Sequence, residues 1–468
     1  MTYFFETYGC EMNIAESAAV ENLFISRGWS KAEKPELADV VIINTCSVRG
    51  SAENRIFGRL GYYSGVKKIR HKEPGAKTRF EEMQPAVKYV EEHGVVPFYV
   101  VLMGCMAERL LDSVKKDYPV IDFAVGTFGK YKFGDIITAI ENHDKPFDIK
   151  EESEYTFPKI SYEQEAFSTF VPIMHGCNNF CTYCIVPYVR GREVSRPAEQ
   201  ILAEIDYLSG RGVKEITLLG QNVNAYRCKD ETAEGGELNF PKLLKKISRH
   251  LDETSSSIKW IRFESSNPND FSDELIEMIA RDKHVCHGFH IAAQHGNNEI
   301  LRRMNRKNTR EEFIELVKKL RKAIPDVELI TDLMVGFPGE TDEQFKDVLS
   351  LMEEVKFESS FMYYYNPREG TPAAKYPDQI PVEVKKARLQ QVIDLQLRHT
   401  EQVMKSRVGQ TVEVLADIVS RDDEKELLGK TSQNERVAFK ADKSLIGTFV
   451  TVRLDSLNGN TFKGTMIE

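Results

Sequence analysis

Short apolar segments alternate with segments of helical period over most of this 468-residue chain. In the first part the apolar segments are Tyr3–Thr7, Val40–Asn44 and Val96–Met103, each followed by a helical pattern. Parallel strands need long crossover connections, which are usually helices, so this alternation favours a parallel sheet. The pattern therefore predicts an α/β domain with a parallel sheet over residues 1–150, followed by a polar linker over residues 151–167.

A second alternating series of six strand–helix units fills residues 168–400. Six units predict a partial (β/α)6 barrel, smaller than the usual eight-unit barrel, with its active face at the carboxyl ends of the strands. The expected strands are Thr169–Met174, Glu215–Leu219, Trp260–Glu264, Gly288–Ala293, Leu329–Val335 and Phe361–Tyr365.

The last part of the chain, residues 404–468, has short β-rich runs separated by turns, which predict a small all-β barrel. The runs are Thr411–Val419, Val437–Phe439, Thr448–Leu454 and Phe462–Ile467. This part contains ten Lys and Arg and ten Asp and Glu residues, so it carries no net basic charge. Residues 64–93, in the first domain, begin with several basic residues, and we expect an insertion with a mobile basic start.

The composition and the apolar runs indicate an ordinary globular protein without a membrane helix. Hydrophobic residues make up 41% and charged residues 29%, as in ordinary globular proteins. No apolar run reaches the roughly 18 residues of a membrane helix, and the N-terminus lacks the features of a secretory signal. We therefore expect a cytoplasmic protein without a membrane segment. The net charge of -9 means that any contact with nucleic acid must be local.

Cys177, Cys181 and Cys184 form a C-x3-C-x2-C run directly after the first strand of the second series. Three thiolates in one loop can ligate three irons of a 4Fe-4S cluster and leave the fourth iron open. The alternative is a structural zinc site, in which His175 would supply the fourth ligand.

Three further cysteines, Cys10, Cys46 and Cys105, each lie just after the end of an expected strand. Because the carboxyl ends of parallel strands meet at one edge of a sheet, we expect these thiols to converge. The alternative is three unrelated buried thiols. Cys228 and Cys286 fit neither group and are interpreted as buried thiols.

The C-x3-C-x2-C run resembles that of the radical S-adenosylmethionine superfamily. Residues 333–340 (LMVGFPGE) resemble the glycine motif after the fifth strand of that superfamily. The segments around Cys10, Cys46 and Cys105 resemble the N-terminal domain of its methylthiotransferase family. The C-terminal module is similar to the TRAM domain of RNA-modifying enzymes.

This resemblance implies two 4Fe-4S clusters and S-adenosylmethionine as cofactors. Cys177, Cys181 and Cys184 would hold the radical-generating cluster, and Cys10, Cys46 and Cys105 an auxiliary cluster that delivers sulfur. One S-adenosylmethionine would donate a methyl group, and a second would be cleaved to a radical that attacks carbon 2 of an adenine. The residues expected to contact S-adenosylmethionine are Tyr183, Gln221, Gly336, Gly339 and Glu340.

Residues 8–13 (YGCEMN) and 219–226 (LGQNVNAY) resemble the branch of the family that acts on N(6)-isopentenyl-adenosine next to the anticodon. The implied partners are the anticodon loop of tRNA and a flavodoxin- or ferredoxin-like electron donor, and we expect a monomer. Two groups of arginines are candidate RNA contacts, although such runs are often solvated faces: Arg190, Arg192, Arg196, Arg302, Arg303 and Arg306.

Two alternatives to this function stay open. A related methylthiotransferase could act on a ribosomal-protein aspartate or on threonylcarbamoyl adenosine with the same chemistry. The other alternative is an iron–sulfur redox sensor that binds RNA. Such a sensor would not need a barrel with a cluster motif that leaves one iron open. His284, His287, His290 and His295 are close in sequence but fall around one strand, so we expect structural roles for them rather than a metal site.

Overall fold

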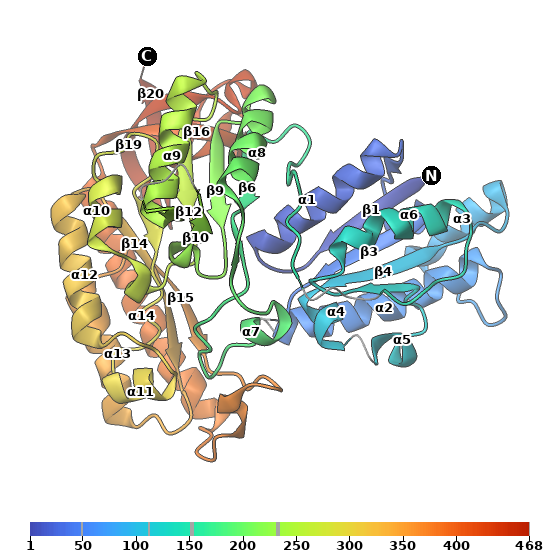
Figure 1. The fold of residues 1–468 in the computed structure, drawn as a ribbon, viewed down its shortest axis with the longest axis horizontal. Helices are drawn as coiled ribbons and strands as arrows, with labels where there is room; N and C mark the ends of the chain where they lie inside the picture. The colour runs from blue at the N-terminus through green and yellow to red at the C-terminus, as the bar shows by residue number, and fades with distance from the viewer. Residues whose placement is uncertain (48–49, 111–112, 150–153, 231–234, 468) are drawn as a thin grey trace. The chain divides into compact units, whose positions relative to one another are not determined.

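The computed structural model describes residues 1–47, 50–110, 113–149, 154–230 and 235–467 (Figure 1). Val48 and Arg49 of the second cysteine segment, and residues 151–153 of the expected linker, lie outside the described residues. The chain forms two compact units. The first contains Met1–Gln164, Phe170–Asn178 and Ile185–Val194, and the second contains Glu165–Thr169, Asn179–Cys184 and Ser195–Glu468.

The first unit contains a five-stranded parallel sheet, as predicted. Its order β2-β1-β3-β4-β5 is the order of flavodoxin-like sheets, whose ligands bind at the carboxyl edge. The strands are β1 (Thr2–Thr7), β2 (Ser30–Lys31), β3 (Val40–Thr45), β4 (Tyr99–Gly104) and β5 (Phe123–Val125). Every residue of β3 and β4 is buried, which explains why both read as uninterrupted apolar runs.

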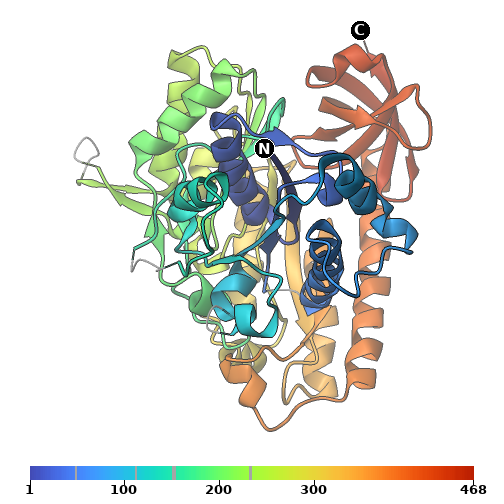
Figure 2. The same ribbon diagram turned by 90° about the vertical axis from the view of Figure 1, so that its right-hand side faces the viewer.

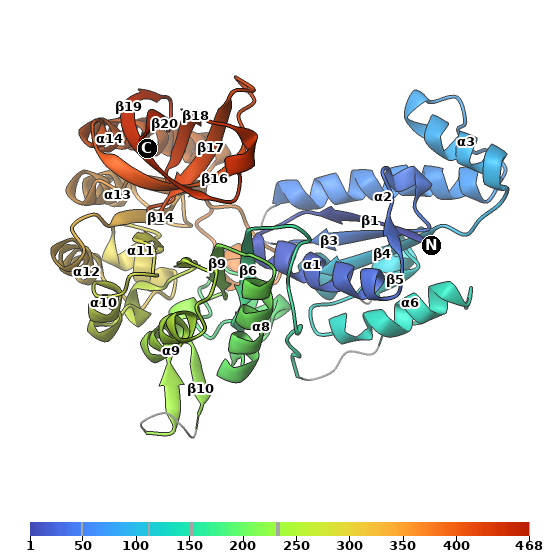
Figure 3. The same ribbon diagram turned by 90° about the horizontal axis from the view of Figure 1, so that it is seen from above.

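Helices cover both faces of this sheet (Figure 3). On one face, α1 (Glu11–Ser26) and α6 (Phe133–Glu141) pack through residues such as Phe24 and Ile137. On the other face lie α2 (Gly50–Arg70), α3 (Gln84–His93) and α4 (Cys105–Leu110). The short helix α5 (Val114–Asp117) precedes β5. None of the helices in the described ranges has the length and apolar character needed to cross a membrane.

The expectation of a mobile basic segment after residue 64 is wrong for its first part. Ser64 to Arg70 form the last turns of α2, and Arg70 is completely buried. The Arg70 guanidinium donates to the carbonyls of Glu36 and Ala38, both at 3.0 Å. Lys67 pairs with Asp122 at 2.7 Å. The sequence shows a run of basic residues. It does not show that one of them, Arg70, is buried against backbone carbonyls of a segment distant in sequence.

Six further strands form two three-stranded sheets, β12-β9-β6 and β13-β14-β15. Isolated parallel bridges from Ile261 to Val285 and from Ser266 to Ile291 join the two sheets, so the six-stranded partial barrel is confirmed. The strands are β6 (Ser168–Pro172), β9 (Glu215–Leu219), β12 (Trp260–Phe263), β13 (Gly288–His290), β14 (Glu328–Val335) and β15 (Ser359–Tyr364). Two short strands, β7 (Met174–His175) and β8 (Val194–Ser195), form a separate pair.

Helices follow the barrel strands along the chain (Figure 1). They are α8 (Ala198–Gly210), α9 (Phe240–Glu253), α10 (Asp273–Ile279), α11 (Asn298–Arg303), α12 (Arg310–Ala323) and α13 (Asp342–Val355). A long helix, α14 (Val382–Arg407), then leads to the C-terminal module (Figure 2).

The C-terminal module is a closed five-stranded barrel, as predicted. Its strands are β16 (Thr411–Val419), β17 (Glu426–Thr431), β18 (Arg436–Lys440), β19 (Phe449–Asn458) and β20 (Thr461–Ile467). The sequence did not indicate β17, because its six residues include Glu426, Gly429 and Lys430 and only a short apolar pair.

Two arginines, the buried Arg262 and the partly buried Arg407, fasten this module to the start of the barrel strands. Arg262 in β12 donates to the carbonyls of Thr431 and Ser432 at 2.7 and 2.8 Å. Arg407, the last residue of α14, lies 2.7 Å from both Glu328 and Glu435. The module therefore sits at the amino ends of the strands, away from the carboxyl ends where a barrel binds ligands.

The pair of carboxylates around Arg407 predicts how stability depends on pH. Burial and the neighbouring Glu435 carboxylate raise the pKa of Glu328 well above its ordinary value. The folded protein therefore keeps this proton at a pH where the unfolded chain, with a glutamate pKa of about 4.3, has lost it. This contribution to stability is complete below that pH and is lost as pH rises through the raised pKa.

We expect Glu328→Gln, which cannot ionise, to gain thermal stability relative to the parent chain as pH rises from 5 to 8. Melting temperatures of both proteins across this range measure the effect. Glu413→Gln is the control, because Glu413 belongs to the same interface but its side chain is 41% exposed. A difference in melting temperature that does not change with pH would contradict the prediction.

Candidate functional site

The three dispersed cysteines of the first unit converge at the carboxyl edge of its sheet, as predicted. Cys10 caps α1 directly after β1, Cys46 follows β3, and Cys105 begins α4 after β4. A hydrogen bond from Cys46 and the nearby charge of Arg190 lower the pKa of the Cys10 thiol to about 6, against the opposing effect of burial. Cys10 thus contacts Cys46, and Cys105 lies close enough for its charge to interact with that of Cys10.

Two asparagines hold the cysteine loops together. The Asn13 amide donates to Asn44 Oδ1 at 2.9 Å and to the Thr45 carbonyl at 3.1 Å. The Asn44 amide donates back to the Asn13 carbonyl at 2.8 Å. Both side chains are completely buried. The sequence analysis did not single out either residue for this role, although each lies within three positions of a cysteine.

Gly104 brings the third loop against this pair. Its φ of +93° is unfavourable for residues with a side chain. A Cβ at this position would lie 2.5 Å from both Asn44 Oδ1 and the Thr45 carbonyl oxygen. The backbone before Cys105 therefore reaches the end of β3, next to Cys46, only because residue 104 is glycine.

The C-x3-C-x2-C loop is fixed at both of its ends by backbone hydrogen bonds. In the first unit, the Cys177 N–H donates to the Gly191 carbonyl at 3.1 Å. In the second unit, the Thr182 N–H donates to the Met304 carbonyl at 3.0 Å. The Asn305 amide donates to the carbonyls of Asn179 and Phe180, at 3.1 and 3.0 Å. The segment that follows α11 thus holds residues 179–182 of the loop within the second unit.

The sheet beside this loop has one covered face and one open face. Strand residues alternate between the faces, and the residues packed against the helices are buried: Phe289, Leu329, Thr331, Leu333, Val335 and Ser360. The residues on the other face are partly or fully exposed: His290, Ile330, Asp332, Met334, Phe361 and Tyr363. Phe361 is 50% exposed. Met334 and Tyr183 pack against the same apolar cluster, so the open face reaches the cysteine loop within the second unit.

The glycine motif at the end of β14 is organised by Glu340. The Glu340 carboxylate accepts from the N–H groups of Gly336 and Phe337 at 2.7 and 3.2 Å, and from Arg388 at 2.9 Å. Gly336 and Gly339 both have positive φ, +69° and +75°. Glu340 is only 4% exposed, so in this structure it shapes the loop. Gln221 lies directly after β9 and is partly buried.

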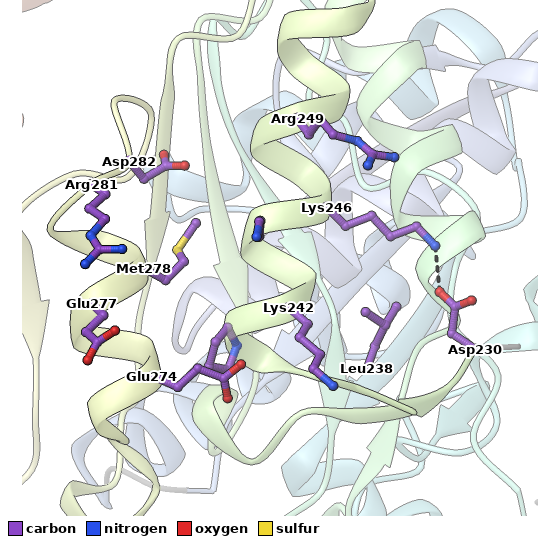
Figure 4. A pocket seen from close by; sticks show the side chains of 12 residues that line it. Asp230, Leu238, Lys242, Lys246, Arg249, Glu274, Glu277, Met278, Arg281 and Asp282 are labelled. Carbon is purple, nitrogen blue, oxygen red and sulfur yellow. Dashed lines mark hydrogen bonds and ion pairs between the residues drawn. The ribbon is translucent and has the colours of Figure 1, made fainter. Parts of the chain in front are cut away.

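A groove on the outer side of the barrel carries none of the predicted site residues (Figure 4). Lys242, Lys246 and Arg249 from α9 line it together with Glu274 and Glu277 from α10. The hairpin of β10 (Arg227–Lys229) and β11 (Glu237–Asn239) contributes Leu238. Its charges are mixed, and it lies between helices rather than at the carboxyl ends of strands.

Comparisons with known proteins agree with this geometry. Residues 171–352 match the Radical SAM superfamily, residues 405–467 the TRAM domain, and residues 2–126 a family described as uncharacterized protein family UPF0004. A curated protein of Treponema denticola, named tRNA-2-methylthio-N(6)-dimethylallyladenosine synthase, is 48% identical over 100% of both chains. Proteins of the same name from Treponema pallidum and Clostridium botulinum are 47% and 37% identical, over 100% and 99% of this chain.

This chain belongs to the family of tRNA-2-methylthio-N(6)-dimethylallyladenosine synthases. Among solved structures, the radical S-adenosylmethionine methyltransferase TsrM from Kitasatospora setae matches 80% of this chain and 77% of its own, with a TM-score of 0.54 and 12% identity. The cobalamin-dependent enzyme OxsB matches 93% of this chain and 63% of its own, with a TM-score of 0.50. At such low identity these matches show a shared fold.

Radical S-adenosylmethionine enzymes of this family use 4Fe-4S clusters, which cysteine thiolates ligate, together with S-adenosylmethionine. Each of the two thiol sets offers three thiols, and all eight cysteines of the chain are free of disulfides. Cys46, Cys105, Cys177 and Cys181 are buried, which protects a cluster from solvent. The remaining cysteines lie elsewhere: Cys286 is buried between β12 and the C-terminal module, as expected. Cys228 is only partly buried, so its interpretation as a buried thiol is wrong.

The candidate RNA-binding arginines occupy very different environments. Arg190 and Arg196 are 3% and 1% exposed and pair with Glu16 and Glu204. Arg306 donates to the Ala292 carbonyl at 2.7 Å and faces Cys181. In this structure these three guanidinium groups serve internal contacts, and the sequence could not show this because burial depends on distant carboxylates. Arg192 and Arg302 are exposed, and Arg303 is partly exposed.

The four clustered histidines have separate partners. Each faces a different carboxylate: His284 faces Asp252, His287 faces Asp326, His290 faces Asp332, and His295 faces Glu340. These pairs tie the segment around β13 to neighbouring elements.

Gly104 offers a test of the first thiol set. We expect Gly104→Ala to bind about four irons per chain after anaerobic reconstitution, instead of about eight, because the added Cβ displaces the Cys105 loop while the other loop stays intact. Iron and sulfide analysis measures this.

Gly75→Ala is a matched control. Gly75 also has positive φ, +78°, but nothing lies within 4 Å of an added Cβ. Gly75→Ala should keep the full iron content. It places an alanine at positive φ, as Gly104→Ala does, but its Cβ meets no neighbouring atom. Full iron loading of Gly104→Ala would show that the close approach of the three loops is not needed.

Proposed function

We propose that this protein methylthiolates carbon 2 of N(6)-isopentenyl-adenosine next to the anticodon of tRNA. The observation that carries the proposal is the pairing of two separate three-cysteine sets in one chain: one at the carboxyl edge of a parallel sheet, and one in the loop after the first strand of a partial barrel. Two sets suit a reaction with two tasks, sulfur delivery and radical generation.

The two clusters and S-adenosylmethionine, when bound, supply the sulfur, the methyl group and the radical that general acid–base chemistry cannot provide. The chain itself holds and orients them. Cys10, Cys46 and Cys105 would ligate the auxiliary cluster, and Cys177, Cys181 and Cys184 the radical-generating cluster. Tyr183, Gln221 and the glycine loop of Gly336 and Gly339 would line the site of S-adenosylmethionine, with Glu340 fixing the shape of that loop.

The open face of β13, β14 and β15 offers a place for the adenine. It reaches the Cys181 loop and presents Phe361 and Tyr363, and exposed aromatic rings are surfaces on which unpaired bases stack. A loop nucleotide is cheaper to unstack than one in a duplex, which suits a target beside the anticodon.

Other parts of the proposal concern partners and organisation. The TRAM module, together with Arg192, Arg302 and Arg303, would contact the RNA backbone. A flavodoxin- or ferredoxin-like protein would supply electrons, and the enzyme would act as a cytoplasmic monomer. We divide the chain functionally at residues 1–150, 168–400 and 404–468, with a linker over residues 151–167.

The substrate assignment is tested with the reconstituted full-length enzyme, S-adenosylmethionine, a reductant and anticodon stem-loops. The adenosine next to the anticodon carries either an isopentenyl group, a threonylcarbamoyl group or no group, and a fourth reaction contains a ribosomal-protein peptide with the candidate aspartate. We expect 2-methylthio product by mass spectrometry only from the isopentenyl stem-loop. Product from another substrate would reassign the enzyme within its family, and absence of 5′-deoxyadenosine from every reaction would favour a redox sensor.

Single cysteine variants separate the two thiol sets. We expect Cys10→Ala to form 5′-deoxyadenosine but neither to capture a methyl group on the protein nor to make methylthio product. Cys181→Ala should form neither deoxyadenosine nor product. The variants fail at different steps because each removes a ligand from a different set.

Cys228→Ala is the control, since Cys228 lies in neither set, and it should retain every activity. Labelled methyl groups on the protein, deoxyadenosine and modified nucleoside are measured in the same reactions. Normal product formation by Cys10→Ala would show that the first thiol set has only a structural role.

A further inference from the structure

A buried ionic network lies against Cys105 in the first unit. Arg190 follows α7 (Val186–Val189), and its Nε lies 3.2 Å from Cys105 Sγ. Its other two nitrogens donate to the carboxylate of Glu16 at 2.8 and 3.3 Å. Glu16 also pairs with Lys130. Arg190 and Glu16 are 3% and 1% exposed, so the network is shielded from solvent.

Two basic side chains in this network, Arg190 and Lys130, share the single carboxylate of Glu16. Burial lowers the pKa of Lys130, which disfavours its charged form. His175 Nδ1 also lies 3.4 Å from Arg190. Within this network, Glu16 is therefore the carboxylate that accepts from Arg190.

The Cys105 sulfur is the acceptor that the third guanidinium nitrogen, Nε, faces. Cysteine binds a metal centre as the thiolate, so a cluster held here would place negative charge against the Arg190 guanidinium.

The position of Arg190 is fixed by packing. Ile185 and Val189 form an apolar cluster with Cys105. The Thr127 hydroxyl donates to the Val189 carbonyl at 2.7 Å, and the Thr127 N–H donates to Glu108 of α4 at 2.6 Å. The helix that ends just before Arg190 is therefore bound to the helix that Cys105 begins, and the guanidinium is held before any ligand binds.

We propose that Arg190 is a positioning residue that donates an N–H to the Cys105 sulfur and raises the reduction potential of the cluster held by Cys10, Cys46 and Cys105. Hydrogen bonds to ligand sulfurs and the local net charge are among the factors that set such potentials. This inference rests on the proposed function, because it assumes a cluster at the first thiol set. It gives Arg190 an internal role in place of the RNA contact predicted from the sequence.

The test uses the full-length chain with Cys177, Cys181 and Cys184 replaced by alanine, so that only the first thiol set binds a cluster. Its reduced fraction is followed by electron paramagnetic resonance at a series of solution potentials. For Arg190→Gln we expect the ratio of reduced to oxidised cluster at a fixed potential to fall about tenfold, which is a shift of about 59 mV for one electron.

Two further variants separate hydrogen bond from charge. Arg190→Gln with Glu16→Gln removes one positive and one negative charge, so the net charge of the network is kept while the contact with sulfur is lost, and the shift should be smaller. Arg190→Lys keeps the cation and should also shift less than Arg190→Gln. Arg192→Gln, which changes an exposed neighbouring arginine, should leave the potential unchanged.

The outcomes are distinct. An unchanged potential in both Arg190→Gln and the double variant, with iron content intact, overturns the proposal. Loss of iron with an unchanged potential of the remaining cluster assigns Arg190 a structural role and also overturns it. If the parent chain with the three alanines binds no cluster, the proposed function fails at its first thiol set, whatever Arg190 does.

Discussion

The reciprocal hydrogen bonds between Asn13 and Asn44 are the contact on which the first cysteine set depends. They join the start of α1 to the end of β3, and Gly104 fits against them with no room for a side chain. The three cysteines of this set follow three different strands, and the first and last of them, Cys10 and Cys105, are more than 90 residues apart in the sequence. Without this buried amide pair, the sheet would bring the three loops to one edge but would not fix the thiols relative to one another.

Buried arginines perform a similar task elsewhere in the chain. Arg388 supports the carboxylate that organises the glycine loop, Arg262 fastens the C-terminal module, and Arg190 faces Cys105. Replacing a buried ion pair with apolar residues is often neutral or stabilising, so stability alone does not explain such pairs. In each case the guanidinium joins a loop to an element distant in sequence. A guanidinium has five N–H donors in fixed directions, so it can hold a loop in one position. Apolar contacts do not specify one geometry in this way.

The sequence predicted the features that follow from local periodicity and strand direction. The parallel sheet, the six-stranded barrel and the meeting of Cys10, Cys46 and Cys105 all depend on where apolar runs end. The sequence failed where the environment of a side chain is made by residues far away. Arg190 and Arg196 looked like members of a basic surface group, but Glu16 and Glu204 bury them. For the same reason, nothing near Asn13 or Asn44 indicated that each is the partner of the other.

The charge of the protein constrains how it can hold RNA. Affinity from phosphate contacts grows with the number of cations that replace counterions, and it weakens with salt in proportion. A chain of net charge -9, with ten basic and ten acidic residues in its TRAM module and three of its candidate arginines turned inward, has few cations to offer. Affinity must then come largely from contacts with unpaired bases, and such contacts discriminate between sequences where phosphates do not. Weak general attraction and selective loop contacts are what an enzyme needs when its target is one modified adenosine among many similar tRNAs.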